Sequence, residues 1–196
     1  GLKNDNYNVT YVEGTLTISK KAITVTADSK TKVYGDNDPE LTYSVDGASI
    51  GEIPGSLSRS AGENVGEYDI TIGSLINDNF EITFNKATLT INKAPLSIKV
   101  NNAEREIGSD NPVFTSSMTG LKLNDSVEIN YVCSADKDSP VGTYEISATA
   151  SDDNYEIAIT FGTLTVNRLT NFVVEVSNVS VTYDGQEHGI IAVSAA

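Results

Sequence analysis

Apolar and polar residues alternate along most of this chain with the two-residue period of a half-buried β-strand. The apolar side chains of Ile23, Val25 and Ala27, for example, would share one face of a strand. The alternation recurs in Tyr68 to Ile72, Leu96 to Val100 and Tyr144 to Ala148. Branched and aromatic residues, which pack well on a pleated surface, are common in these segments, and no clear helical stripe of ten or more residues is present. The pattern therefore predicts a mainly β protein with little helix.

One strand-like segment occurs three times. An Asn-aromatic pair leading to a Thr-Leu-Thr ending is found at Asn6 to Ile18, Asn79 to Ile91 and Asn154 to Val166. The leucines of these endings are 73 and 75 residues apart, since they stand at positions 16, 89 and 164. This period is too long for a solenoid repeat and fits a small independent domain. The chain is therefore predicted to be a tandem array.

The repeat divides the chain into two complete copies, residues 21–93 and 94–168. Residues 1–20 correspond to the closing strand of a preceding copy, and residues 169–196 correspond to the opening part of a following copy. The junctions are short and contain no Gly/Ser spacer, and units of this size bury little surface alone. We therefore expect neighbouring repeats to contact one another in an elongated, stiff array.

Both complete copies carry the same two turn signals. Gly35 and Pro39 in the first copy match Gly108 and Pro112 in the second, and such residues form loops in which Gly supplies positive φ. A later Gly-x-Tyr signal stands at Gly66 with Tyr68 and at Gly142 with Tyr144.

Between these signals lies a less regular stretch, Ala48 to Asn64 in the first copy and Leu121 to Pro140 in the second. We expect any short helix to lie here, with Asn124 or Asp125 as a cap for one turn over Leu123 to Val127. Because these loops differ most between the copies, any recognition surface is expected at Ser49 to Ser58 and Lys122 to Ser126.

On these motifs the chain resembles the bacterial mostly-beta-grasp repeat domains, called MBG domains, of the YGX and YDG types. The first copy carries Tyr34-Gly35-Asp36, and the last segment carries Tyr183-Asp184-Gly185 in the YDG form. The second copy has Ile107 in place of the tyrosine, so no role of Tyr34 beyond packing is expected. The resemblance implies a sheet around a short or vestigial helix, no catalytic residues, and long secreted bacterial proteins similar to adhesins.

The net charge and the single cysteine limit the binding partners and cross-links that this chain is expected to have. The formal net charge is -14, which disfavours nucleic acid and anionic membranes as partners. With one cysteine, Cys133, an intrachain disulfide is excluded, and no run of eighteen apolar residues predicts membrane insertion. We expect an export signal, if present, to lie outside this sequence.

Few residues are candidates for catalysis or for metal binding. His188 is the single histidine, and Cys133 falls in an alternating run without a histidine partner nearby in sequence. No nucleophile, phosphate-binding or cofactor motif is present, so we expect neither an enzyme nor a bound cofactor. Asp36, Asp38 and Glu40 are calcium candidates, although Asp and Asn are also ordinary turn formers.

The expected function is that of a non-catalytic stalk in an extracellular bacterial surface protein similar to adhesins. The alternative is an adhesive module that binds host glycan or protein through the variable loops. Sugar sites often use an exposed aromatic side chain, and Tyr43 and Tyr131 are the tyrosines least explained by the repeat pattern.

Overall fold

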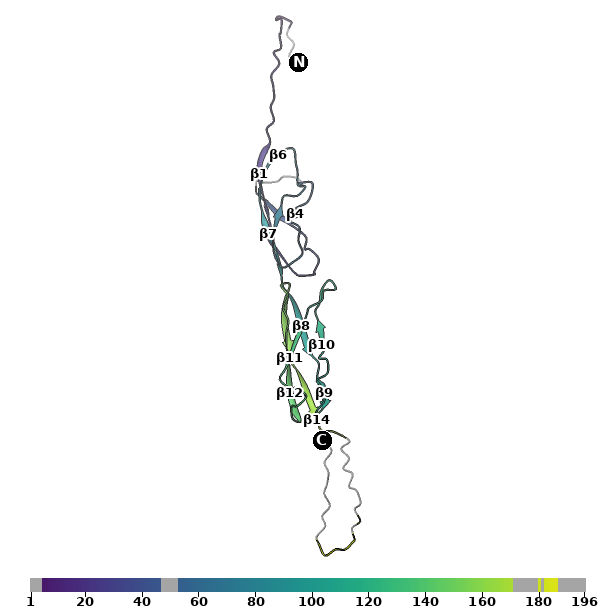
Figure 1. Ribbon diagram of the computed structural model, residues 1–196. Coiled ribbons are helices and arrows are strands. Elements are labelled where there is room, and N and C mark those ends of the chain that lie inside the picture. Colours follow the sequence, from purple (N-terminus) through teal and green to yellow (C-terminus); the bar gives the residue numbers. More distant parts are fainter. Residues whose placement is uncertain (1–4, 47–52, 171–179, 181, 187–196) are drawn as a thin grey trace. The chain divides into compact units, whose positions relative to one another are not determined.

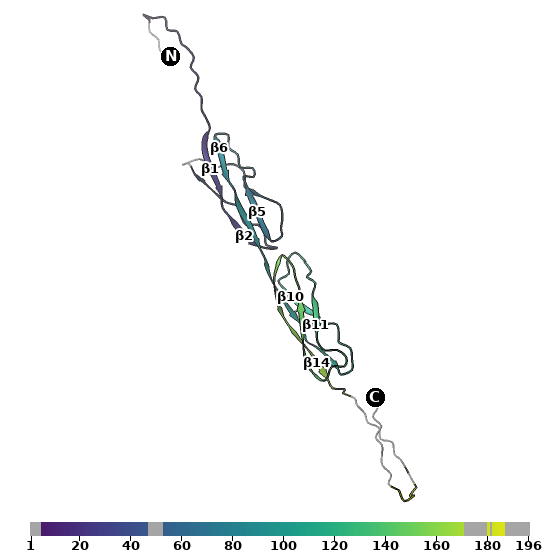
Figure 2. The ribbon, with the colours of Figure 1, turned by 60° about the vertical axis from the view of Figure 1, so that its left-hand side comes forward.

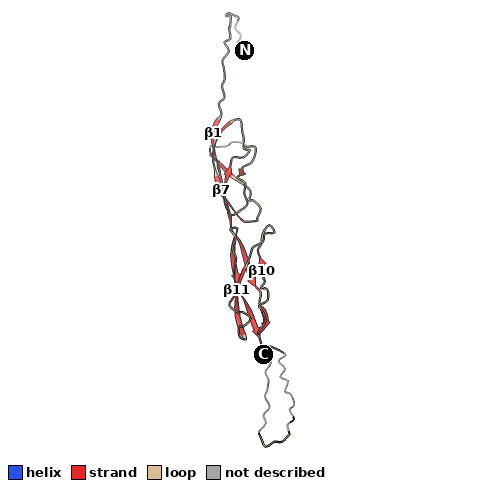
Figure 3. Cartoon of the chain, viewed as in Figure 1, coloured by secondary structure: helices blue, strands red, loops and turns tan. Residues whose placement is uncertain are grey.

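The computed structural model describes residues 5–46, 53–170, 180 and 182–186, and every described regular element is a β-strand (Figures 1 and 3). The chain forms two compact units. The first comprises Gly1–Pro95, Lys122–Asp125 and Asp152–Glu156, and the second comprises Leu96–Leu121, Ser126–Ser151 and Ile157–Ala196. No helix long and apolar enough to cross a membrane occurs among the described residues.

Each sequence repeat contributes seven strands. The first repeat forms β1 (Lys21–Ala27), β2 (Lys30–Val33), β3 (Tyr43–Asp46), β4 (Ser58–Arg59), β5 (Gly66–Thr71), β6 (Phe80–Asn85) and β7 (Ala87–Asn92). The second repeat forms β8 (Ala94–Val100), β9 (Ala103–Glu106), β10 (Ser116–Thr119), β11 (Asn130–Cys133), β12 (Gly142–Thr149), β13 (Tyr155–Thr160) and β14 (Gly162–Asn167). The predicted mainly β fold is thus confirmed.

The two repeats share one topology. The first has a three-stranded sheet in the order β3-β1-β6 and a four-stranded sheet in the order β2-β7-β5-β4. The second has the matching orders β10-β8-β13 and β11-β12-β14-β9. Strands β3 and β5 pair antiparallel with β1 and β7, whereas β1 pairs parallel with β6 and β2 pairs parallel with β7.

The parallel pairing runs through both sheets of the first repeat without a change of register. Partners in β1 and β6, such as Thr26 and Asn85, differ by 59 residue numbers. Partners in β2 and β7, such as Lys30 and Leu89, also differ by 59. In Figure 2, β1 lies beside β6, and β2 continues from the end of β1. The opening and closing segments of the repeat are therefore two long strands that lie side by side and switch sheets together.

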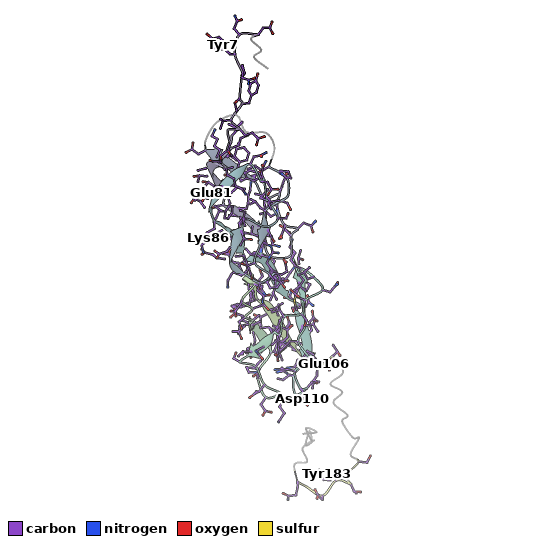
Figure 4. All side chains as sticks on the ribbon, turned by 90° about the horizontal axis from the view of Figure 1, so that it is seen from above. Tyr7, Glu81, Lys86, Glu106, Asp110 and Tyr183 are labelled. Atoms are coloured by element: carbon purple, nitrogen blue, oxygen red, sulfur yellow. The ribbon has the colours of Figure 1, made fainter. Side chains whose placement is uncertain are left out.

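Alternation explains which face of each strand is buried. Ile23 and Val25 of β1 and Ile70 and Leu89 of the other sheet are at most 3% exposed and pack in one core cluster. Glu81 and Lys86, by contrast, are exposed, and Figure 4 shows their side chains projecting outward. In the second repeat, the corresponding cluster includes Val100, Ile146, Ala148, Leu164 and Val166.

The expected helix over Leu123 to Val127 is wrong, since residues 121–140 contain turns and strand β11. Leu123 and Asn124 have φ values of 52° and 62°, and the backbone N–H of Asp125 donates to the carbonyl oxygen of Lys122 at 2.8 Å. Two successive left-handed residues closed by this bond make a tight turn that is incompatible with a right-handed helix.

Two further expectations concern the ends of the sequence. No strand is assigned to residues 5–20, although they match the segment that forms β6 and β7. A strand requires a partner for its backbone bonds, and none of the described strand pairings includes residues 5–20. His188 lies outside the described residues.

Candidate functional site

A buried lysine on β2 gathers the loops that follow it. The side chain of Lys32 is 4% exposed. Its Nζ donates to Asp38 Oδ1 and Glu63 Oε2, both at 2.7 Å, and to the carbonyl oxygen of Asp36 at 3.2 Å. Arg59 on β4 joins the same group, because its Nε donates to Asp38 Oδ2 at 2.6 Å and its Nη2 donates to Glu63 Oε1. Two cations and two carboxylates therefore hold the turn after β2 against the loop after β4, and we call these four side chains the charge cluster.

The charge cluster shifts the titration of its members in the directions expected for ion pairs. Hydrogen bonds from Arg59 and then Lys32 hold the pKa of Asp38 below its ordinary value of 3.8. Bonds from Lys32 and Arg59 likewise lower the pKa of Glu63. For Lys32, burial opposes the charged form, but the bonds to Asp38 and Glu63 outweigh it and raise the pKa. All three groups are therefore charged at neutral pH.

The second repeat has a buried cation at the equivalent place but uses neutral partners. Arg105 on β9, 7% exposed, follows Lys32 by 73 residues. Its Nε donates to Asn111 Oδ1 at 2.8 Å, and its two Nη atoms donate to the carbonyl oxygens of Glu106 and Asp136. Asn111 in turn donates through Nδ2 to the carbonyl oxygen of Ala135 at 2.6 Å. In both repeats, therefore, a buried cationic side chain is hydrogen-bonded to the loop that contains the Gly and Pro turn residues.

A second cluster, which we call the tyrosine cluster, surrounds Tyr34 in the first compact unit. The hydroxyls of Tyr34 and Tyr155 both donate to Asp125 Oδ2, at 2.9 and 2.7 Å. The two rings pack edge to face with centroids 5.5 Å apart, and both side chains are buried, at 5% and 2% exposed. The bond to Asp125, followed by burial, raises the pKa of Tyr34 to about 12. The role of Tyr34 thus extends beyond the packing expected from the sequence.

The two remaining residues of the Tyr34-Gly35-Asp36 turn also meet the Lys122–Asp125 segment. Asp36 Oδ1 accepts a hydrogen bond from Lys122 Nζ at 2.9 Å. Gly35 has φ +78°, and a Cβ built at this position would lie 2.5 Å from Cβ of Lys122. Gly108, at the same place in the second repeat, has φ +83° with nothing within 4 Å of such an atom. Gly35 is therefore required by close approach as well as by conformation.

The Gly-x-Tyr signals act locally in each repeat. The hydroxyl of Tyr68 donates to the carbonyl oxygen of Asn64 and that of Tyr144 donates to the carbonyl oxygen of Pro140, both at 2.8 Å. Gly66 and Gly142 are the first residues of β5 and β12. Each tyrosine therefore fastens its strand to the loop four residues earlier.

The other predicted residues lie at the ends of loops or on packed faces. Pro39 and Pro112 directly follow the clamped residues Asp38 and Asn111. Gly185 has φ +81°, close to that of Gly35 and Gly108, and Tyr183, which is labelled in Figure 4, is 92% exposed.

Tyr43 and Tyr131 are explained by packing. Tyr43 packs against the first core cluster and Tyr131 against the second. The Tyr131 hydroxyl also donates to Ser116 Oγ at 2.8 Å. Cys133 is half-buried beside the second cluster.

The calcium candidates have cationic neighbours. Asp36 and Asp38 bond to Lys122, Lys32 and Arg59 as given above, and Glu40 is exposed. Among the described residues, no group of three or more His, Cys, Asp or Glu side chains is arranged to hold a metal ion. Calcium binding by this loop stays a prediction.

A shallow hollow of about 310 Å³ lies over the charge cluster, lined by Lys32, Gly35, Asp36, Asn37, Asp38, Glu63 and Leu123. Its charged groups are paired with one another, and every buried side-chain N or O of the described residues has a hydrogen-bond partner. This arrangement fixes loops and leaves no activated nucleophile or base at the hollow.

Sequence reasoning missed Lys32 and Arg105, and it named Asp125 only as a helix cap and a loop residue, not as the acceptor for two tyrosines. One signal could have identified the cations: both stand two residues before the Tyr34 and Ile107 positions, at the same place in the two repeats. No local signal exists for Asp125, whose partner Tyr34 is 91 residues away.

The comparisons with known proteins agree with the repeat topology. Among curated proteins, none matches the chain significantly. The family model described as MBG domain (YGX type) matches residues 23–90 and again residues 96–165. These two matches cover most of the chain and coincide with the two seven-stranded repeats. The chain therefore belongs to the MBG domain family of the YGX type and contains two of its domains in tandem.

Proposed function

We propose that this chain is a force-bearing, non-catalytic stalk region of a bacterial cell-surface protein similar to adhesins. The observation that carries the proposal is the parallel pairing of the opening and closing strands in each repeat. Tandem MBG domains, a repeat family without enzymatic members, support a structural role in a surface protein.

The parallel pairing determines how a pulling force would act. The chain enters the first repeat at the start of β1 and leaves it at the end of β7. Because β1 and β2 run parallel to β6 and β7, these two points are at opposite ends of the ladder. Tension between them acts along the strands, so the six β1–β6 pairs and the four β2–β7 pairs share the load. Shear of many bonds together resists force better than opening them in sequence.

The second repeat has the same arrangement. Strand β14 pairs parallel with β9 over Leu164 to Asn167, and β13 neighbours β8 in the other sheet. The buried cations Lys32 and Arg105 further fasten the loops beside these strands. Tandem domains with one load path would suit a stalk that holds another part of the protein away from the cell.

The proposed extracellular location draws on the family and on composition. The net charge of -14 disfavours association with nucleic acid, and one cysteine leaves each repeat dependent on packing and strand pairing. Both properties fit a soluble, acidic region exposed outside a bacterial cell.

Binding of host glycan or protein is the second candidate function. The observation in its favour is Leu123, 61% exposed on a variable loop and part of the lining of the 310 Å³ hollow. A glycan and matrix-protein array, probed with and without calcium, tests this candidate. A saturable signal lost on exchange of residues 122–126 would favour adhesion, whereas silence across the array would favour the stalk.

Single-molecule stretching of the whole chain tests the stalk. We expect two unfolding events, one for each repeat, and each should lengthen the chain by about 200 Å because roughly seventy residues become extended. Unfolding at forces too low to detect, without discrete events, would contradict a force-bearing role.

A further inference from the structure

The tyrosine cluster joins segments that belong to different sequence repeats. Within the first compact unit, Tyr34–Asp36 comes from the first repeat, whereas Lys122–Asp125 and Asp152–Glu156 come from the second. All three segments belong to the first compact unit.

Each residue of the Tyr34-Gly35-Asp36 turn has its own partner in the Lys122–Asp125 segment. The Tyr34 hydroxyl donates to Asp125, the absent side chain of Gly35 makes room for the stem of Lys122, and Asp36 pairs with the Lys122 ammonium at 2.9 Å. If only the backbone conformation of the turn mattered, Gly35 would be needed, but Tyr34 and Asp36 would not.

The Asp152–Glu156 segment completes this contact. The Tyr155 hydroxyl accepts from the backbone N–H of Lys122 at 2.8 Å while donating to Asp125. Asn154 Oδ1 accepts from the backbone N–H of Val65, a residue of the first repeat, at 2.9 Å. Two buried tyrosine hydroxyls that share one carboxylate favour a specific partner, because an unmatched residue would leave a polar group without a hydrogen bond.

The two repeats carry different residues at the equivalent turn, so the two turns cannot make the same contacts with a neighbouring repeat. Ile107, Gly108 and Ser109 replace Tyr34, Gly35 and Asp36, so the turn of the second repeat lacks both the phenol and the carboxylate. Phe80 occupies the position in the first repeat that Tyr155 occupies in the second, directly after an asparagine. The Tyr-Gly-Asp turn therefore fits a repeat with an acidic turn and a tyrosine, and the Ile-Gly-Ser turn lacks the groups for that contact.

We propose that the Tyr-Gly-Asp turn is a docking site whose partner is the following MBG repeat, recognised by a Lys-x-x-Asp turn and an Asn-Tyr pair. This selects which repeat follows which in an array. The inference deepens the proposed stalk function but does not depend on a surface location or on the direction of force.

Residue-resolved hydrogen exchange of the whole chain tests the docking site. Tyr34→Phe removes one hydroxyl, and the backbone N–H groups of Lys122 and Val65 report on the two docked segments. We expect at least about tenfold faster exchange at both N–H groups, because the variant loses a hydrogen bond to a charged group that holds the two segments. Circular dichroism should show that the variant remains folded.

Tyr68→Phe is the matched control, because its hydroxyl bonds to the Asn64 carbonyl within the same repeat. It should leave exchange at Lys122 unchanged. At the Val65 N–H, whose own acceptor neither variant removes, Tyr155→Phe should act like Tyr34→Phe, and the double variant should add little, because both hydroxyls share Asp125. Unchanged exchange at Lys122 and Val65 in Tyr34→Phe, or an equal effect of Tyr68→Phe, would overturn the proposal. Neither result would bear on the force measurement.

Discussion

Substitution of Gly35 and Gly108 separates two reasons for a glycine at the turn: the left-handed backbone conformation and the close approach of the Lys122 side chain. Gly35 and Gly108 have nearly the same φ, +78° and +83°, so alanine is strained equally at both. Left-handed backbone costs an L-residue about 1–2 kcal/mol. At Gly35 alone the new Cβ would also lie 2.5 Å from Cβ and 2.8 Å from Cγ of Lys122. Displacing that turn adds about 1–3 kcal/mol, as for overpacked sites.

Asparagine isolates the second contribution, since it tolerates the left-handed region. We expect Gly108→Asn to change stability by less than about 0.5 kcal/mol and Gly35→Asn to cost about 1–3 kcal/mol. Denaturant unfolding, followed by hydrogen exchange at strands β5 and β12, assigns each change to its repeat. For domains of this size, 1 kcal/mol corresponds to a shift in Tm of about 4–8 °C.

Lys122→Gly provides the check on this reasoning, because it removes the atoms that a Cβ at Gly35 would meet. Gly35→Asn should cost less in the Lys122→Gly background than in the natural chain. Equal tolerance of asparagine at Gly35 and Gly108 would refute the close approach.

Further predictions concern charge and strain. Because the pKa values of Asp38 and Glu63 are lowered in the folded chain, the stabilisation from these carboxylates is present above their ordinary values of 3.8 and 4.5 and is lost as pH falls through the lowered values. Thermal unfolding at acidic pH should therefore show that the first repeat loses more stability than the second. Asp38→Asn should reduce this difference. Arg105→Met should destabilise the second repeat by about 2–3 kcal/mol in denaturant unfolding, because Asn111 and two carbonyl groups lose their donor; an unchanged midpoint would contradict this. Leu123→Asn should stabilise the chain by about 0.5–1 kcal/mol in the same assay, because Leu123 is exposed and has φ 52°, and destabilisation would show that its side chain is needed.

Alternation was sufficient to predict the long strands and their buried faces. Ile23 and Val25 on β1 and Ile146 on β12 are buried as the two-residue period indicated. Strands β4 and β9 were not singled out, because two- and four-residue strands are too short to show a period. The predicted helix was wrong because the caps Asn124 and Asp125 also favour tight turns.

The clusters depend on contacts that no local pattern contains. Gly35, Gly108 and the Gly-x-Tyr motifs were identified from their repetition, and their turn geometry agrees with that reading. Asp125 and Tyr155 became recognisable only through Tyr34, from which they are separated by 91 and 121 residues. The family resemblance was confirmed, whereas the mechanical role and surface location stay proposals.

The central claim, that each repeat is loaded in shear, is tested most directly by pulling one repeat in two directions. In a Cys133→Ser background, Lys20→Cys with Lys93→Cys would load the parallel ladder along its strands. Lys20→Cys with Asp78→Cys would instead open the ladder from one end, because Lys21 N–H bonds to the Asn79 carbonyl at the starts of β1 and β6. The account predicts a severalfold higher unfolding force for the first pair of handles. Equal forces in the two directions would contradict it.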